Sequence, residues 1–160
     1  MQNCFLKYDI KKDGTNMWQE INDQAELDAF MALFGGFHDS CIKEFKYTSG
    51  AYVEKGLGMH PINDERSLKV IFQRQYLHPT VIEIEFMGLS QLKISPTDKY
   101  TCEIGVATMK MHEEGVYWYD EMELPESDLS NFSGTLICAA KVRWREADEY
   151  IGDTEVYQSR

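Results

Sequence analysis

The sequence predicts an α+β fold in which one N-terminal amphipathic helix packs on a predominantly antiparallel curved sheet, or partly open barrel, of about six to eight strands. Three observations predict this class. Helical periodicity is confined to one segment before residue 36, alternation of apolar and polar residues dominates after residue 40, and no further helices are available as crossovers for a parallel sheet. The 160 residues with 43% hydrophobic content suit a single domain over residues 1–160 with one core.

The helix is expected to run from Asp23 to Phe34. Its apolar residues recur at helical spacing, on Leu27, Phe30, Met31 and Phe34. Asp23 can accept a hydrogen bond from the backbone N–H of Glu26, and Glu26 can reach back, as in a capping box. Gly35 tolerates the left-handed conformation that ends a helix.

Strands are expected over residues 41–48, 67–76, 80–88, 91–95, 102–113, 116–120 and 135–146. The segments 67–76 and 80–88 should form a hairpin turned at His78-Pro79, and Glu114-Gly115 should turn 102–113 into 116–120. Residues 147–160 are a polar tail that is free to fray, although Ile151, Val156 and Tyr157 offer apolar contacts that can dock it.

Strict alternation along each strand assigns its side chains to the core or to water. The first strand is expected to carry Cys41, Lys43, Phe45 and Tyr47 on one face. The central hairpin should direct Leu68, Val70, Phe72, Ile82, Ile84 and Phe86 inward, and Glu83 and Glu85 to a wet outer face. A later strand should place Cys102, Ile104 and Val106 together. The last should set Leu136, Cys138, Ala140, Val142 and Trp144 against Lys141, Arg143 and Arg145.

Composition narrows the classes of partner. The formal net charge of −11 argues against nucleic acid, because phosphate backbones are bound by clustered Lys and Arg. The sequence offers no apolar run long enough for a membrane helix, and residues 1–18 lack the apolar core of a signal peptide, so we expect a soluble cytoplasmic protein. There the cysteines are expected to be free thiols: Cys4, Cys41, Cys102 and Cys138.

The segment "FHDSC" contains the residue types of a nucleophilic or metal site. His38, Asp39 and Cys41 can be interpreted as the centre of a small hydrolase or metal-dependent enzyme. No nucleophile signature surrounds Cys41, and His38, Asp39 and His112 do not follow the spacing of a known metal motif. The alternative, which we favour, is a structural corner in which Phe37 fills the core and polar side chains cap the backbone. We therefore expect no catalytic residue, metal or cofactor.

An acidic stretch from Glu113 to Asp128 contains aromatic residues and no Lys or Arg. Carboxylates beside aromatic rings can form a surface that docks a basic protein. The expected binding residues are Glu113, Glu114, Tyr117, Trp118, Tyr119, Asp120, Glu121 and Glu123. The alternative is a solvated hairpin and loop whose aromatic residues face inward.

The segments "GGFHDSCIKEFKYTSGAYV", "SLKVIFQRQY", "IEIEFMGLSQLKI", "GVYWYD" and "KVRWR" resemble a family of small uncharacterised bacterial proteins, from about residue 34 to residue 145. That resemblance implies no activity or catalytic residue. The helix followed by Phe37, His38 and Asp39 and a sheet is also similar to immunity proteins of polymorphic toxin systems. This second resemblance implies an acidic module that neutralises a basic toxin.

Overall fold

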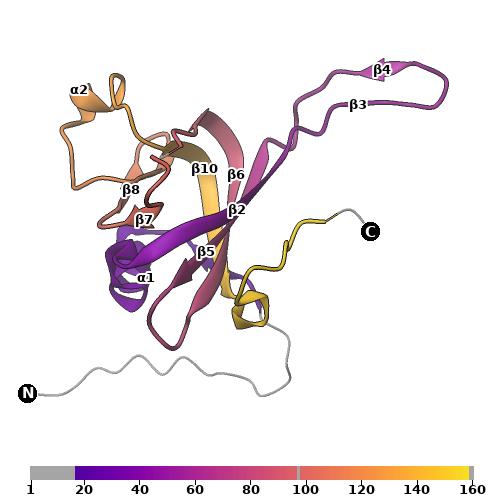
Figure 1. The fold of residues 1–160 in the computed structure, drawn as a ribbon. Coiled ribbons are helices and arrows are strands. Elements are labelled where there is room, and N and C mark those ends of the chain that lie inside the picture. The colour runs from indigo at the N-terminus through magenta and orange to yellow at the C-terminus, as the bar shows by residue number, and fades with distance from the viewer. Residues whose placement is uncertain (1–16, 97, 159–160) are drawn as a thin grey trace, which may run out of the picture.

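The chain forms an α+β fold around one curled antiparallel sheet (Figure 1). The computed structural model describes residues 17–96 and 98–158; residues 1–16, which include Cys4 and most of the segment tested for a signal peptide, lie outside the described part. The sheet has eight strands in the order β7-β2-β5-β6-β10-β9-β8, and β1 pairs with β10. The predicted fold class is therefore confirmed.

The strands of this sheet are β1 (Gln19–Ile21), β2 (Ser40–Thr48), β5 (Ser67–Arg74), β6 (Val81–Lys93), β7 (Glu103–Ile104), β8 (Thr108–His112), β9 (Gly115–Tyr119) and β10 (Leu136–Glu146). The helices are α1 (Gln24–Leu33) and α2 (Glu126–Leu129), with 3-10 turns at Gly35–Phe37 and Asp148–Tyr150. Within the described ranges, no helix is long and apolar enough to cross a membrane.

A separate two-stranded ribbon links β2 to β5 and consists of β3 (Tyr52–Val53) and β4 (Met59–His60). Figure 1 shows it projecting away from the sheet. Its large apolar side chains are exposed, at Tyr52, Val53, Leu57, Met59 and Ile62. The ribbon is not predicted from the sequence, because strands of two residues are too short to show a period.

Helix α1 begins and ends as the sequence predicts. The Asp23 carboxylate accepts from the backbone N–H of Glu26 at 2.9 Å. The Glu26 carboxylate reaches back, to the backbone N–H of Asn22 at 2.7 Å, one residue before the position of an ordinary capping box. After the helix, Gly35 takes a φ of 65°, which a side chain would disfavour.

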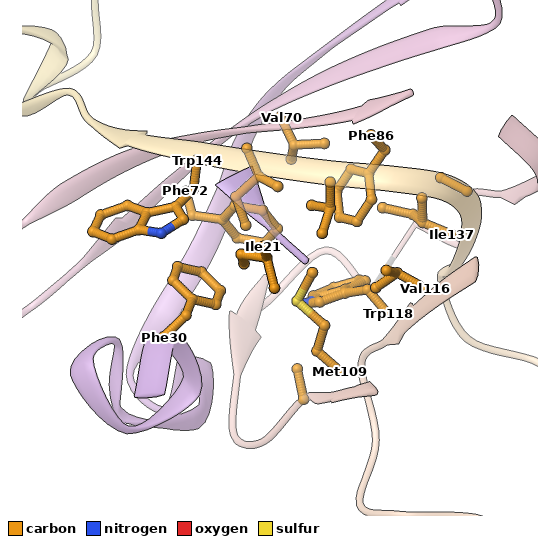
Figure 2. Close-up of a cluster of buried hydrophobic side chains, with 14 of the residues drawn as sticks. Ile21, Phe30, Val70, Phe72, Phe86, Met109, Val116, Trp118, Ile137 and Trp144 are labelled. Carbon is orange, nitrogen blue, oxygen red and sulfur yellow. The ribbon is translucent and has the colours of Figure 1, made fainter. Parts of the chain in front are cut away.

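The helix packs on one face of the sheet, the inner face, through an aromatic core. Phe30 lies 5.2 Å from Trp144, measured between ring centroids. Figure 2 shows Phe30, Phe72 and Trp118 converging from the helix, β5 and β9. The ring of Phe37 lies 4.8 Å from Phe72 and 5.6 Å from Trp118, so it joins the helix corner to two strands. The prediction that Phe37 fills the core is confirmed.

A β-bulge in β2 corrects the predicted face of Cys41. Ile42 pairs with Phe72, but the next pair is Glu44 with Ile71, so Lys43 is the extra residue. One inserted residue reverses the alternation, since side chains have a period of two. Cys41 therefore does not share a face with Phe45. Ile42 and Phe45 pack against the core cluster instead.

The same kind of irregularity corrects β10. Ile137 and Ala139 belong to the inner core together with Val142 and Trp144, a spacing that breaks alternation after Ala139. Leu136 and Cys138, which were predicted on the face of Val142, pack in a second cluster with Tyr119 and Leu129. The register between β10 and β6 shifts nearby, between Cys138 and Ala139, and the extra residue there is Ser90 of β6.

The predicted strand 102–113 is also wrong as one continuous element. It is divided into β7 and β8, and the backbone N–H of Ala107 donates to the carbonyl of Gly36 at 3.1 Å. Ala107 is buried while Cys102 and Val106 are exposed, so these two side chains do not form an inward face with Ile104. Conversely, the segments 80–88 and 91–95, predicted as two strands, form the single strand β6.

Alternation predicts that Glu83 and Glu85 face water, but the outer face of the sheet is buried at these two residues. The side chains of Glu83 and Glu85 are only 3% and 9% exposed. Arg145 donates to Glu83 through Nε and Nη2, both at 2.6 Å, and Arg143 donates to Glu85 in the same two-pronged way. Both guanidinium groups lie over the Trp18 ring. These carboxylates are buried as ion pairs.

The C-terminal tail covers part of this outer face. The Glu44 carboxylate accepts from the backbone N–H groups of Val156 and Tyr157, at 2.6 and 3.0 Å. The Tyr157 hydroxyl donates to Glu83 at 2.7 Å. Burial and this bond to a carboxylate raise the pKa of Tyr157, so the hydroxyl keeps its proton. Val156 and Tyr157 therefore dock the tail, whereas Ile151 is exposed.

We predict that Glu83→Gln destabilises the protein by about 3 kcal/mol, because it leaves the Arg145 guanidinium beside an uncharged partner in a buried setting. Urea unfolding followed by circular dichroism measures the loss. The matched control is Glu20→Gln, since Glu20 is half-exposed and lies 3.8 Å from Arg143. That control should change the free energy of unfolding by less than about 0.5 kcal/mol. Equal losses in the two variants would contradict the buried ion pair.

Candidate functional site

The "FHDSC" corner places two of its three candidate residues in contact. His38 Nδ1 lies 2.9 Å from Asp39 Oδ2. The Tyr76 hydroxyl, from the loop between β5 and β6, donates to the same carboxylate oxygen at 3.0 Å. The contact of Tyr76 with Asp39 is not predictable from the sequence, because it depends on the antiparallel pairing of Ser40 with Arg74, which brings the β5–β6 loop to the corner.

The backbone of this corner is held in an unusual conformation. Phe37 and Asp39 have φ angles of 64° and 55°, in the left-handed region that side chains disfavour. The Asp39 carbonyl accepts from the backbone N–H of Gln75 at 3.2 Å. The Ser40 hydroxyl donates to the Phe37 carbonyl. Of the polar side chains predicted to cap backbone donors, Ser40 bonds to a backbone acceptor instead, and the Asp39 carboxylate contacts the side chains of Tyr76 and His38.

Arg74 ties the same corner to the helix. Its guanidinium donates to the carbonyl of Leu33 at 3.1 Å and to that of Pro79 at 2.7 Å, and it lies over the Phe34 ring. Burial lowers the pKa of Arg74 from its ordinary value. A guanidinium remains charged despite such a shift. Arg74 therefore closes the C-terminal end of α1 with a positive charge, where the helix dipole favours one.

Electrostatics keep Asp39 ionised. The hydrogen bond from Tyr76 is the main cause that lowers the pKa of Asp39, and His38 lowers it further. The same bond raises the pKa of Tyr76. The Asp39 carboxylate thus contacts two polar side chains, those of Tyr76 and His38. The site is accessible, since the His38 side chain is 63% exposed. An aspartate and a histidine in contact also form the orienting half of a nucleophilic triad.

The Cys41 thiol lacks the lowered pKa of an activated nucleophile. Burial and the neighbouring Cys102 thiol raise its pKa, which is opposite to what an activated thiol requires. Cys41 lies across from Gln73 in the pairing of β2 with β5, before the bulge at Lys43. The thiol is therefore held largely protonated at neutral pH.

The candidate metal ligands are also dispersed. His112 lies in β8, where its Nδ1 is 3.3 Å from the Glu126 carboxylate and its ring packs on Tyr117. It is paired with residues other than His38 and Asp39. Across residues 17–96 and 98–158, no three His, Cys, Asp or Glu side chains are grouped in a way that could hold a metal ion.

The acidic stretch from Glu113 to Asp128 separates into exposed carboxylates and inward-facing rings. Trp118 and Tyr119 are fully buried, and Tyr117 is half-buried in β9. The Tyr119 hydroxyl accepts from the backbone N–H of Leu124 at 3.0 Å, so it supports the loop. Trp118 is buried in the inner core and Tyr119 in the second cluster, so neither ring is accessible to a partner.

The carboxylates of this stretch lie at the surface. Exposed side chains are Glu113, Glu114, Glu121, Glu123, Glu126 and Asp128, and we call this set the acidic lobe. Lys110 lies 2.7 Å from Glu123, and that ion pair lowers the pKa of Glu123 and raises that of Lys110. Asp120 differs from the lobe because it is half-buried. Its carboxylate accepts from the backbone N–H of Thr135 at 2.9 Å, and burial raises its pKa.

No family model, curated protein or solved structure matches the chain significantly.

Removal of the Tyr76 hydroxyl should raise the pKa of Asp39 towards its ordinary value. We predict this for Tyr76→Phe, measured by carbon-13 NMR titration of the carboxyl carbon. Because the pKa of Asp39 is lower in the folded chain, its contribution to stability is present above the unfolded value of about 3.9 and is lost as pH falls through the folded value. Tyr76→Phe should lose part of that acid dependence.

The control for this titration is Tyr47→Phe, which removes another exposed hydroxyl, one that faces Asn63 instead. It should leave the pKa of Asp39 unchanged. An unchanged pKa in Tyr76→Phe as well would show that the hydroxyl does not hold the carboxylate.

Alkylation by iodoacetamide should follow the exposure and pKa of each thiol. Among the three cysteines that the structure describes, we predict that Cys102, which is exposed, reacts first, and that Cys41 reacts more slowly. Cys138 should be protected, because burial raises its pKa to about 12. Peptide mapping by mass spectrometry resolves the separate cysteines, and similar rates in urea provide the control. Fastest labelling at Cys41 would restore the interpretation of a cysteine nucleophile.

Proposed function

We propose that this chain is a non-enzymatic, cytoplasmic protein-binding module whose acidic lobe docks a basic protein partner. The observation that carries the proposal is the exposure of the lobe's carboxylates, two of them in the turn between β8 and β9 and four in the connection between β9 and β10. Within the described residues, the ion pairs of the lobe are those of Lys110 with Glu123 and of His112 with Glu126. Glu113, Glu114 and Glu121 thus offer negative charge to a partner.

The net charge of the chain supports the same class of partner. At −11, the chain attracts basic proteins over a distance and repels acidic ones and nucleic acids. The resemblance of the corner around His38 to immunity proteins favours a basic toxin as the partner, with neutralisation as the outcome. In this proposal the buried Trp118 and Tyr119 shape the lobe and do not contact the partner.

A second candidate is a small hydrolase or metal-dependent enzyme centred on His38, Asp39 and Cys41. The contact of His38 with Asp39 and the left-handed φ of Asp39 favour it, because strained backbone and oriented histidines are found at active sites. The raised pKa of Cys41 argues against a thiolate nucleophile. The binding module therefore has the stronger support.

The test compares two variants with the same change in charge. One carries Glu113→Gln, Glu114→Gln and Glu121→Gln in the lobe, and the other carries Asp28→Asn, Asp153→Asn and Glu155→Gln at exposed positions elsewhere. Each purified chain is immobilised and used to capture proteins from a native bacterial lysate at low and high salt, with quantitative mass spectrometry of what is retained. We expect the lobe variant to retain about tenfold less of the basic proteins.

The control variant should capture as much as the natural chain, and high salt should release what is bound, because exposed charges are screened. Equal loss in both variants would mean that net charge alone attracts proteins. Capture of no basic protein by the natural chain at low salt would contradict the proposal.

A further inference from the structure

A hollow of about 240 Å³ lies beside β2 at the point where β7 leaves it. The pairing of β7 with β2 covers only Ser40 and Cys41. The opposite edge of β2 is paired with β5 along the strand. Among the described residues, no other strand pairs with β2 from Ile42 onward, so this part of the edge has unpaired backbone groups.

The hollow follows this free edge. Consecutive residues from Ile42 to Phe45 line it. The side chains of Lys43 and Glu44 are engaged elsewhere, with the tail on the outer face: Lys43 donates to the carbonyls of Gly152 and Thr154, and Glu44 accepts from Val156 and Tyr157. The contribution of Lys43 and Glu44 to the hollow therefore comes chiefly from the strand's backbone.

The walls of the hollow combine apolar side chains with one carboxylate. Ile42, Phe45, Ile94 and Ile104 supply the apolar part. Asp120 also lines it, and burial raises the pKa of this carboxyl group. A positive charge placed beside Asp120 would favour the ionised carboxylate, which burial disfavours. The walls thus suit an apolar side chain next to a basic one.

We propose that the free edge of β2 and its hollow bind an extended, basic segment of the partner protein by strand addition. This inference rests on the proposed function and names the form in which the partner is recognised. In strand addition, backbone hydrogen bonds hold the peptide and alternate side chains enter a pocket. Here an apolar residue enters the hollow, and a Lys or Arg of the same segment lies near Asp120.

The size of the hollow favours a peptide side chain over a separate small molecule. Pockets for drug-sized ligands usually measure roughly 300–1,000 Å³ and enclose most of the ligand. A hollow of about 240 Å³ beside an open strand suits one or two side chains of a longer chain. The net charge of −11 selects a basic segment over an acidic one.

The probe is a fluorescein-labelled synthetic peptide of eight residues in which Lys and Val alternate, titrated with the full chain and followed by fluorescence anisotropy. A peptide of the same composition with the Lys and Val residues in two blocks has the same charge but lacks the alternation. We expect the alternating peptide to bind at least tenfold more tightly. Equal affinities would mean attraction by charge alone and would overturn the proposal.

Two substitutions locate the site. Ile94→Lys places a charge at the wall of the hollow, and Ile151→Lys makes the same change at an exposed position of the tail. We expect at least a tenfold loss of affinity for Ile94→Lys and none for Ile151→Lys. Asp120→Asn keeps an acceptor for the Thr135 N–H and should weaken binding of the Lys peptide, but not of a peptide that alternates Gln and Val. Equal effects of the two Lys variants would overturn the proposal.

Amide hydrogen exchange of the full chain distinguishes the occupants. The peptide should slow exchange within residues 42–48. Amides on the outward edge that are already protected without peptide would assign the edge to residues 1–16 or to a second copy of the chain, and would overturn the proposal. The lobe variant separates the two proposals, since it should lose lysate capture while peptide protection of residues 42–48 persists if the edge is the site.

Discussion

The packing of the Phe37 ring is the contact on which the rest of this structure depends. The ring lies between the helix and the sheet, 5.0 Å from Phe34 and 4.8 Å from Phe72. To reach that position the backbone turns through Gly35, Gly36 and Phe37 with positive φ throughout, a conformation that costs free energy at Phe37. Burial of a complete aromatic ring returns about 2–3 kcal/mol or more. The positive φ at Phe37 therefore follows from the packing of its ring in the core.

Side chains are buried on both faces of the sheet, but the interactions that bury them differ. The inner face is apolar and aromatic, while the outer face buries Glu83 and Glu85 against Arg145 and Arg143. Such pairs contribute little net stability compared with apolar residues, but they fix register because a displaced strand would leave a buried charge unpaired. The tail adds the Tyr157 hydroxyl to this layer. The edges and connections of the sheet, together with the uncovered part of its outer face, are therefore the accessible surfaces.

Those accessible surfaces are consistent with a role in binding. In the proposed role, the charge of the acidic lobe acts at a distance and governs encounter, whereas the backbone groups and hollow at the free edge of β2 act at contact and govern specificity. Asp120 links the two regions. It is the first residue of the connection between β9 and β10, which carries four of the lobe's carboxylates, and it also lines the hollow. His38 and Asp39 lie at the corner instead, where Tyr76 holds the carboxylate.

The sequence by itself determined the elements whose signal is local. The caps of α1, its apolar stripe, the two hairpins and the antiparallel class follow from residues close together in the chain, and the structure confirms them. Only the tertiary structure decided which face of the sheet each side chain occupies. The bulged residue Lys43 and the irregularity after Ala139 each move the later side chains of their strand to the opposite face, and neither can be recognised in the pattern of apolar and polar residues. It also decided the burial of Glu83 and the approach of Tyr76 to Asp39, since an ion pair or hydrogen bond between distant segments depends on strand register.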